Sequence, residues 1–380
     1  MTDPLSEPII ELEPIEGFAA GPSAPTTSKT GASTATVGHR VDAGDDPNVP
    51  LLEVRNLCVE FKTEDGIVKA VQNVSYTLCE GETLGIVGES GSGKTVTSLA
   101  VLGLLPKKAK VTGEVLFRGR NLVTMGEREM QSIRGRRIAM IFQDALASLN
   151  PVFKVGDQIA EAINVHADGK IGTDDERVIE LLDLVGIPNP KARASQYPHE
   201  FSGGMRQRAM IAMSIANDPD VIIADEPTTA LDVTIQAQVL EVLERVQDRT
   251  GSAVLLITHD LGVVAGVTDR ILVMYAGRQV ETSTVDDVFY QPSHPYAQGL
   301  LASLPRLDRR RDGERLYRIK GQPPSLIFLP PGCAFNPCCP AAEPGLCDVT
   351  KRDLIEVSPD HLSACHFAQD MFDGTREAVS

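Results

Sequence analysis

The segment GIVGESGSGKT at residues 85–95 constrains the fold of this chain more than any other feature. The apolar run ETLGIVG leads into it, and the helix-compatible VTSLAVLGLL follows it. A G-x-x-x-x-G-K-T pattern between a buried strand and a helix is typical of a loop whose backbone N–H groups surround phosphate oxygens. The pattern predicts a parallel α/β core and a nucleoside triphosphate ligand. A flexible Gly/Ser turn is the alternative, and the flanking strand and helix disfavour it.

Each part of this loop has an expected task. The glycines let the main chain turn its N–H groups inward, Lys94 reaches the terminal phosphates, and the Thr95 hydroxyl can hold Mg²⁺. The expected phosphate site comprises Gly88, Glu89, Ser90, Gly91, Ser92, Gly93, Lys94 and Thr95.

An acidic pair closes the apolar run VIIADE. Hydrolysis of a nucleoside triphosphate needs a carboxylate that holds the metal and a group that positions the attacking water. We assign the first task to Asp225, acting on Mg²⁺ through water, and the second to Glu226. The alternative is that the pair only begins the turn toward Pro227, and the phosphate loop upstream argues against it.

His259 ends another apolar run, LLITHD. An imidazole at this place could contact the γ-phosphate and sense its loss. A single histidine at the end of a strand is more often structural, so this residue alone does not establish a role.

The rest of the chain divides into segments that differ in composition and in hydrophobic periodicity. Residues 1–49 are rich in Pro, Ser and Thr and carry eight acidic against two basic side chains, so we expect a disordered tail. Residues 51–78 alternate apolar and polar positions, as half-buried antiparallel strands do, with a turn at KTEDGI. Helical patterns fill the stretch from about 144 to 215, and a βαβ rhythm follows, which implies parallel strands.

Composition and charge limit the partners. Lys plus Arg number 36 against 52 Asp plus Glu, a net charge of −16, which disfavours nucleic acid and anionic lipid surfaces. We see no apolar run near the roughly 20 residues of a membrane-spanning helix. Seven cysteines, an odd number, and the lack of a signal-like start favour a reducing cytosol. We therefore expect any membrane association to run through a protein partner.

The block EFSGGMRQRAMIAMSIANDPDVIIADEPTTALD at residues 200–232 indicates the family. It resembles the signature region of ATP-binding cassette (ABC) ATPases, and Met205, Ala209, Ala212 and Ala216 recur at core-facing helical spacing. A helix cap would explain Ser202 alone, but not the whole block. The resemblance implies that Ser202, Gly203 and Gly204 bind the γ-phosphate held by an opposite subunit.

Other elements of the ABC pattern occur in order from about Leu51 to Pro305. The resemblance implies that Gln143 contacts Mg²⁺, that Asp232 lies in a loop at the dimer interface, and that Phe61 stacks on adenine. It also implies a switch role for His259 and the catalytic role for Glu226. The expected fold is an α/β ABC-type P-loop ATPase core with an antiparallel β subdomain, a helical subdomain and a C-terminal Cys-rich extension.

Within this family the chain resembles the ATPase subunits of bacterial dipeptide and oligopeptide importers, the DppD/OppD-like group. The resemblance is carried by the signature block, by HPYAQGLLASLP and by the extension GQPPSLIFLPPGCAFNPCCPAA. It implies ATP and Mg²⁺ as ligands, two transmembrane permease subunits as partners, and an extracytoplasmic peptide-binding protein that acts indirectly. Because each ATP lies between two cassettes, a second ATPase subunit is also implied, as a homodimer or heterodimer at the cytoplasmic face of the membrane.

Three other functions stay open at this point. The same group contains importers of nickel and glutathione. A soluble ABC ATPase that acts on ribosomes or DNA usually has two cassettes, or one cassette split by a coiled coil, and neither occurs here. An iron–sulfur redox sensor with vestigial nucleotide binding is disfavoured by intact Lys94, Glu226 and His259.

The expected domain boundaries follow from these patterns. We expect a tail at 1–49, a nucleotide-binding domain at 50–298 with its helical subdomain at about 144–215, and the extension at 299–380.

The extension carries a cluster of cysteines. Cys333, Cys339, Cys347 and Cys365 have five, seven and seventeen residues between successive members. Four thiolates can hold a 4Fe–4S cluster or a tetrahedral zinc, and the resemblance favours the iron–sulfur cluster. Free buried thiols are the structural alternative. Cys338 departs from the group's pattern, and His361 and His366 are substitute ligands or packing residues.

Overall fold

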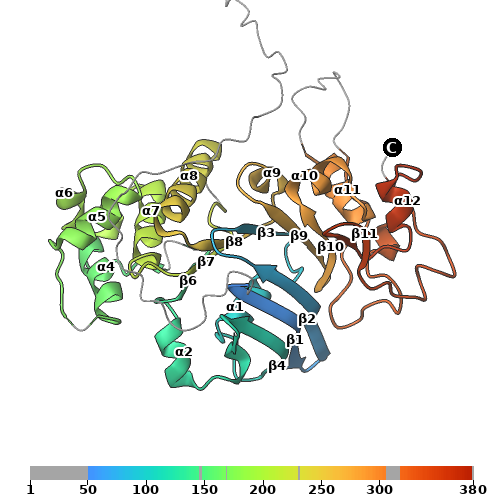
Figure 1. Cartoon of the computed structure of the whole chain (residues 1–380), viewed down its shortest axis with the longest axis horizontal. Coiled ribbons are helices and arrows are strands. Elements are labelled where there is room, and N and C mark those ends of the chain that lie inside the picture. The colour runs from blue at the N-terminus through green and yellow to red at the C-terminus, as the bar shows by residue number, and fades with distance from the viewer. Residues whose placement is uncertain (1–49, 145–147, 168, 230–231, 305–316, 379–380) are drawn as a thin grey trace, which may run out of the picture. The chain divides into compact units, whose positions relative to one another are not determined.

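A parallel sheet lies at the centre of the structure (Figure 1). The computed structural model describes residues 50–144, 148–167, 169–229, 232–304 and 317–378. The parallel strands, in spatial order, are β9 (Arg270–Tyr275), β3 (Thr83–Val87), β8 (Ala253–Thr258), β7 (Val221–Asp225) and β6 (Ile138–Ile141). Nearly every side chain on these strands is buried, as the continuous apolar runs of the sequence require for a sheet covered on both faces.

An antiparallel sheet forms a second layer, drawn in blue in Figure 1. Its order is β2 (Gly66–Leu78), β1 (Leu52–Thr63), β4 (Ala109–Phe117) and β5 (Arg120–Asn121). The β1–β2 hairpin closes at the pair Thr63 and Gly66, so the strands and turn expected at 51–78 are confirmed. This sheet packs on the central sheet and on α1 (Lys94–Val101) through one hydrophobic cluster.

The helical subdomain continues beyond β6 and β7, in green in Figure 1. Its helices are α4 (Val155–Asn164), α5 (Glu176–Leu184), α6 (Pro190–Ala194) and α7 (Gly203–Ser214), with a 3-10 turn at Pro198–Glu200. Ala209, Ala212 and Ala216 are buried and Met205 is partly buried, so the core-facing spacing predicted for this helix is confirmed. Small residues on this stripe let α7 lie close to α4 and α5.

The remaining helices lie between the strands of the two sheets or within the C-terminal extension. They are α2 (Glu127–Ile133), α8 (Val233–Thr250), α9 (Leu261–Val264), α10 (Val285–Tyr290), α11 (Pro295–Ala302) and α12 (Ala368–Phe372), with 3-10 turns at Leu122–Thr124 and Asn336–Cys338. Within the described ranges no helix has the length and apolarity to cross a membrane.

The C-terminal extension is built onto the central sheet. Strand β10 (Arg278–Thr284) pairs with β9 and then with β12 (His361–Ser363), which pairs with β11 (Ile355–Ser358). Sheet pairing and buried side chains such as Phe335 hold the extension in place. Strands of three and four residues are too short to show periodicity in the sequence.

The expected domain limits stay predictions. The tail predicted at 1–49 lies outside the described residues. Helix α11 spans the predicted limit at 298/299, and β12 extends the same sheet as β10.

Candidate nucleotide-binding site

The loop between β3 and α1 has the backbone that its glycines allow. Gly88 and Gly93 have φ values of +155° and +100°. A Cβ at Gly88 would overlap the carbonyl oxygen of Met274, and a Cβ at Gly93 would overlap that of Ala70. Only glycine therefore fits these two positions, and the loop forms a cradle that side chains would fill.

Lys94 is held inside this cradle. Its Nζ donates hydrogen bonds to the carbonyl oxygens of Gly88 (2.7 Å) and Glu89 (3.0 Å) and lies 3.9 Å from Oε1 of Glu226. Burial lowers the pKa of Lys94, while the nearby carboxylates of Glu226, Asp225 and Glu89 act in the opposite direction. An ammonium group at the base of the loop is placed to meet phosphate oxygens.

Ser92 adds an unpartnered donor to the same loop. Its side chain is 4% exposed, and its Oγ has no hydrogen-bond partner among the described residues. A buried hydroxyl without a partner is costly, so a polar ligand at this position would stabilise it. The loop thus fits a phosphate group by its shape, by its ammonium group and by this free hydroxyl.

Thr95 and Asp225 come together where the strand β7 ends beside α1. The Thr95 Oγ1 donates to Oδ1 of Asp225 at 3.1 Å. Burial raises the pKa of Asp225, and the Thr95 hydrogen bond acts in the opposite direction. Hydroxyl and carboxylate oxygens are ligands that Mg²⁺ accepts, so these residues fit the ion.

Glu226 lies at the centre of a polar cluster. Its backbone has φ +48°, a left-handed conformation for a non-glycine residue, and its N–H donates to the Ile257 carbonyl at 2.8 Å. Its Oε2 accepts from Gln143 Nε2 (2.9 Å) and from Thr229 Oγ1 (2.8 Å), and lies 3.4 Å from Nδ1 of His259. Gln143 and His259, which the resemblance assigns to the catalytic site together with Glu226, thus both lie beside the Glu226 carboxylate.

Three other expected contacts lie on separate elements. The Phe61 ring, on β1, is half-buried against the antiparallel layer and leaves part of its surface open. Ser202 caps α7, accepting from the Met205 N–H, and Asp232 caps α8, accepting from the Ile235 N–H. The capping bonds explain part of the choice of Ser and Asp, and both residues remain exposed for a second contact.

Two residues of this site were missed at the sequence level. Thr229 orients Glu226, and its signal was the PTT triplet that follows the acidic pair. Tyr296 accepts a hydrogen bond at its hydroxyl from the Glu89 N–H (2.9 Å), and its signal was the HPY triplet. Neither triplet carries a spacing rule that places it beside the phosphate loop.

The four cysteines of the expected metal site line one pocket. Cys333, Cys339, Cys347 and Cys365 all contribute to it, and none forms a disulfide. Burial, reinforced by the neighbouring thiols, raises the pKa of Cys339 to about 11 and that of Cys365 to about 12. Among the described residues, however, no group of three or more His, Cys, Asp or Glu is arranged to hold a metal ion. The expected iron–sulfur or zinc centre is therefore not supported by this arrangement.

The two alternative ligands have other partners. His361 is fully buried, and its Nε2 lies 2.8 Å from both Glu281 Oε1 and Ser293 Oγ. His366 Nε2 lies 2.9 Å from the Thr350 carbonyl. His361 is thus a packing residue, as one of the two sequence readings expected.

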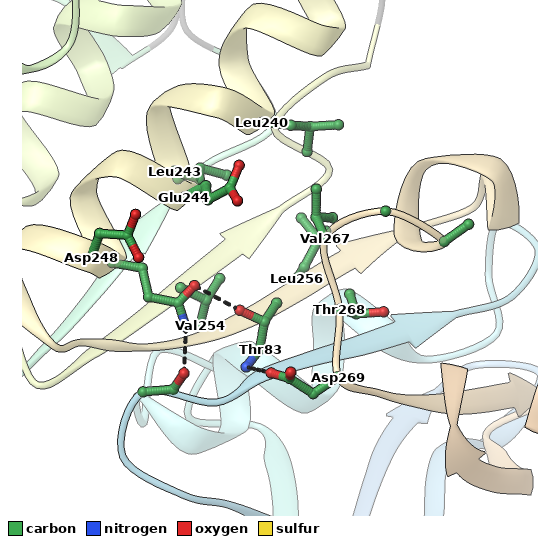
Figure 2. A pocket seen from close by; sticks show the side chains of 14 residues that line it. Thr83, Leu240, Leu243, Glu244, Asp248, Val254, Leu256, Val267, Thr268 and Asp269 are labelled. Atoms are coloured by element: carbon green, nitrogen blue, oxygen red, sulfur yellow. Dashed lines mark hydrogen bonds between the residues drawn. The ribbon is translucent and has the colours of Figure 1, made fainter. Parts of the chain in front are cut away.

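A separate hollow of about 470 Å³ lies between α8, β8 and the loop after α9 (Figure 2). The Thr83 N–H donates to Oδ2 of Asp269 at 2.8 Å, and the Thr83 hydroxyl donates to Oε1 of Gln247 at 3.0 Å. Figure 2 shows Thr83 and Asp269 side by side at this hollow. The hollow shares no residue with the phosphate loop, and Glu244 and Asp248 give it acidic walls. Acidic walls do not suit a phosphate, and the hydrogen bonds of Gln247 with Thr83 and Gly81 connect α8 to the start of β3 beside this hollow.

Comparison with known proteins agrees with this geometry. Residues 71–229 match the protein family described as ABC transporter, and residues 280–347 match the one described as Oligopeptide/dipeptide transporter, C-terminal region. The dipeptide transport ATP-binding protein DppD of Bacillus subtilis is 54% identical over 292 residues, which are 76% of this chain and 87% of that protein. The chain belongs to the family of oligopeptide and dipeptide transport ATP-binding proteins.

Further similarities delimit how far the match extends. The oligopeptide transport ATP-binding protein OppD of Mycobacterium bovis is 52% identical over 83% of this chain, and the chain spans about half of that relative, 52% of its length. The dimeric structure of MJ0796, a bacterial ABC transporter cassette, matches with a TM-score of 0.55 at 27% identity, over 62% of this chain and 98% of that one. The expected ABC-type core is thereby confirmed.

Proposed function

We propose that this ABC family member is the ATP-hydrolysing subunit of an importer for dipeptides or oligopeptides. The observation that carries the proposal is the phosphate loop with Lys94, Thr95, Asp225 and Glu226 at one place in the fold. The proteins named as peptide transport ATP-binding proteins are identical to this chain at 52% and 54% of the aligned residues, and this identity supports the choice of cargo.

The residues of the site divide the chemistry among them. Thr95 and Asp225, with Gln143 nearby, would hold Mg²⁺, which when bound neutralises charge on the phosphate oxygens. Glu226 positions the attacking water and takes its proton, because Gln143 and Thr229 hold the carboxylate in a fixed orientation. His259 is half-exposed beside Glu226, from where it would contact the γ-phosphate.

A complete site needs a second cassette. Ser202 and Gly203 are exposed at the start of α7, where backbone N–H groups attract an anion. We propose that they bind the γ-phosphate on a second ATPase subunit, with Asp232 at the interface and Phe61 on the adenine. The second subunit is a copy of this chain or a related subunit.

The permease subunits would dock beside Gln143. Phe142, Val152 and Phe153 are large apolar side chains that stay exposed close to Gln143 in the sequence, with 45%, 70% and 54% exposure. Exposed apolar side chains grouped in this way are typical of a protein contact. We propose that this surface contacts the permease subunits and that they hold the subunit at the cytoplasmic face of the membrane.

The cysteine pocket is a second, finer proposal. The four thiols line one pocket, although among the described residues they are not arranged around a metal ion; on the resemblance to the peptide-importer group we propose that as thiolates they would bind a 4Fe–4S cluster or, alternatively, zinc. We expect anaerobically purified protein to be brown and to contain iron, measured by metal analysis and absorption. If the protein contains stoichiometric zinc and no iron, the bound metal is zinc and not an iron–sulfur cluster. If it contains no metal, the four cysteines are free thiols.

Uptake in cells tests the transport proposal. Cells would carry either this chain or its Glu226→Gln variant, and uptake of labelled di- and oligopeptides would be measured with nickel and glutathione as controls. We expect peptide uptake to be lost in the variant alone. Loss of nickel or glutathione uptake with normal peptide uptake would change the cargo, and no difference for any solute would favour a soluble ATPase.

A further inference from the structure

The HPY triplet at residues 294–296 reaches the phosphate loop through Tyr296 but has no role in the chemistry proposed above. Pro295 begins α11, and His294 caps it by accepting at Nδ1 from the Tyr296 N–H at 3.1 Å. The Tyr296 side chain is fully buried, with 0% exposure. The triplet therefore delivers a tyrosine hydroxyl to a fixed point in the interior.

That fixed point is the phosphate loop. The Tyr296 hydroxyl accepts from the backbone N–H of Glu89, and Lys94 donates to the backbone carbonyl of the same residue. Tyr296 and Lys94 thus hold Glu89 at both of its backbone groups. Because the Glu89 N–H is bonded to the Tyr296 hydroxyl, it is not available to a phosphate in the cradle. The Tyr296 hydroxyl thus helps to set the conformation of the loop from outside the cradle.

The Tyr296 ring also contacts the cysteine loop, which we define as residues 333–339. Its centroid lies 5.4 Å from the ring of Phe335 and 4.7 Å from the ring of Tyr275, and the Tyr275 and Phe335 rings are 5.2 Å apart. Phe335 is 2% exposed and lines the cysteine pocket. These three rings, the aromatic cluster, pack the cysteine loop against the residue that holds the phosphate loop.

A buried carboxylate fixes the start of the triplet. Glu281 on β10 accepts from the N–H groups of Ser293 (2.7 Å) and His294 (2.9 Å). Glu281 is 0% exposed, so this anchor has little freedom to move. Displacement of Phe335 would therefore pass to the Tyr296 ring rather than be absorbed by movement of the whole helix.

We propose that Tyr296 is a positioning residue for the phosphate loop, and that the aromatic cluster makes nucleotide affinity depend on the conformation of the cysteine loop. This proposal rests on the proposed function only in requiring that the phosphate loop binds a nucleotide. It identifies a site outside the nucleotide pocket that regulates it.

Tyr296→Phe tests the hydroxyl while keeping the ring. We expect the Kd for ADP and ATP, measured by titration of the full chain, to rise about two- to tenfold, since one hydrogen bond is lost. Tyr76→Phe is the matched control, because Tyr76 is buried with no hydroxyl partner among the described residues. We expect its Kd to match the wild type. A wild-type Kd in Tyr296→Phe would overturn the proposal.

A double-mutant cycle tests the coupling. Phe335→Leu, which lies outside the nucleotide site, is expected to raise the Kd in the wild-type background and to have little further effect in Tyr296→Phe, since both changes act through the same hydroxyl. Full additivity of the two effects, or a wild-type Kd in Phe335→Leu, would contradict the coupling. Thermal unfolding of each variant shows that the binding change is not loss of fold.

Thiol reactivity gives a reciprocal readout that does not need Phe335→Leu. Coupling between two sites acts equally on both equilibria, so ADP should lower the fraction of molecules whose cysteine loop is open. With a thiol reagent that reacts more slowly than the loop opens and closes, ADP should therefore slow modification several-fold. Cys58 and Cys79 would be replaced by serine to remove background labelling. At saturating ADP the protection should be lost in Tyr296→Phe, and equal protection in both proteins would refute the proposal.

Lys94→Ala separates this proposal from the proposed function. If Lys94→Ala binds nucleotide as the wild type does, the site assignment itself fails. If Lys94→Ala loses binding while Tyr296→Phe keeps it, only the role of Tyr296 is wrong.

Discussion

Glu226 shows how single residues are forced into place at this site. Its φ of +48° is unfavourable for a residue with a side chain, and hydrogen bonds at its backbone and carboxylate hold it there. Such local strain is common where a side chain must point in one direction for chemistry. Lys94 is also held in an unfavourable state, because burial lowers the pKa of its ammonium group. An anionic ligand beside it would stabilise the charged form.

Binding and turnover should separate at these two residues. We expect Glu226→Gln to bind ATP normally and to lose turnover by about 10²-fold or more, because the amide cannot accept a proton from water. Lys94→Ala should weaken ATP binding at least tenfold, since it removes a buried charged donor. Nucleotide titration and phosphate release would be measured on both proteins. Normal turnover in Glu226→Gln would show that another group activates the water.

At the scale of elements, the strand β3, its loop and helix α1 act as one unit. The strand is buried along its whole length, so the loop begins at a fixed point, and α1 begins immediately after Gly93. The backbone of the loop is packed against the carbonyl groups of Ala70 and Met274, which belong to other strands. The shape of the cradle is thus set by two neighbouring strands as well as by its own sequence.

Two glycines of the loop should differ sharply on substitution. Gly88→Ala should abolish ADP binding and destabilise the fold, because its Cβ would overlap the Met274 carbonyl. Gly91 has φ +78°, but a Cβ added there would meet no other atom. Gly91→Ala should therefore lower the free energy of unfolding by only about 1–2 kcal/mol, through backbone strain. Urea unfolding and ADP titration would compare them. Equal losses in both variants would mean that φ alone, and not the close contact, restricts the loop.

At the scale of the described molecule, the extension and the ATPase core share one sheet. Strand β12 adds to β10, and a buried polar cluster of Glu281, Ser293 and His361 lies under this junction. Every member of the cluster is fully buried, so its hydrogen bonds are made within the cluster, and among the described residues only Nδ1 of His361 has no partner there. The extension therefore depends on one carboxylate of the core for its position.

Removal of that carboxylate should loosen the extension. Glu281→Ala leaves two backbone N–H groups without their acceptor and leaves Nε2 of His361 with Ser293 Oγ as its remaining partner, so we expect a loss of about 3 kcal/mol or more in the free energy of unfolding. Hydrogen exchange should speed up at residues 355–363. Glu241→Ala, an exposed glutamate on α8, is the control and should cost less than about 1 kcal/mol. A Glu281→Ala protein as stable as this control would disprove the anchoring role.

Much of the core and its phosphate loop could be predicted from the sequence. Apolar runs in the sequence identify the buried strands. Gly88 and Gly93, next to Lys94, mark positions where the backbone adopts a positive φ, so the loop could also be predicted. The order of the strands in the sheet, the short strands of the extension and the roles of Thr229 and Tyr296 could not be predicted. None of these leaves a periodic signal.

The sequence by itself determined the phosphate loop, the acidic pair and the family, because these depend on neighbouring residues whose spacing is fixed by the chain. Only the tertiary structure decided that Gln143 meets Glu226 across 83 residues and that Tyr296 meets Glu89 across 207. It also decided that the cysteine loop packs on the residue that holds the phosphate loop. Contacts of this kind follow from how strands and helices stack, and the free energy that selects them comes from burial of surface that no single segment can bury alone.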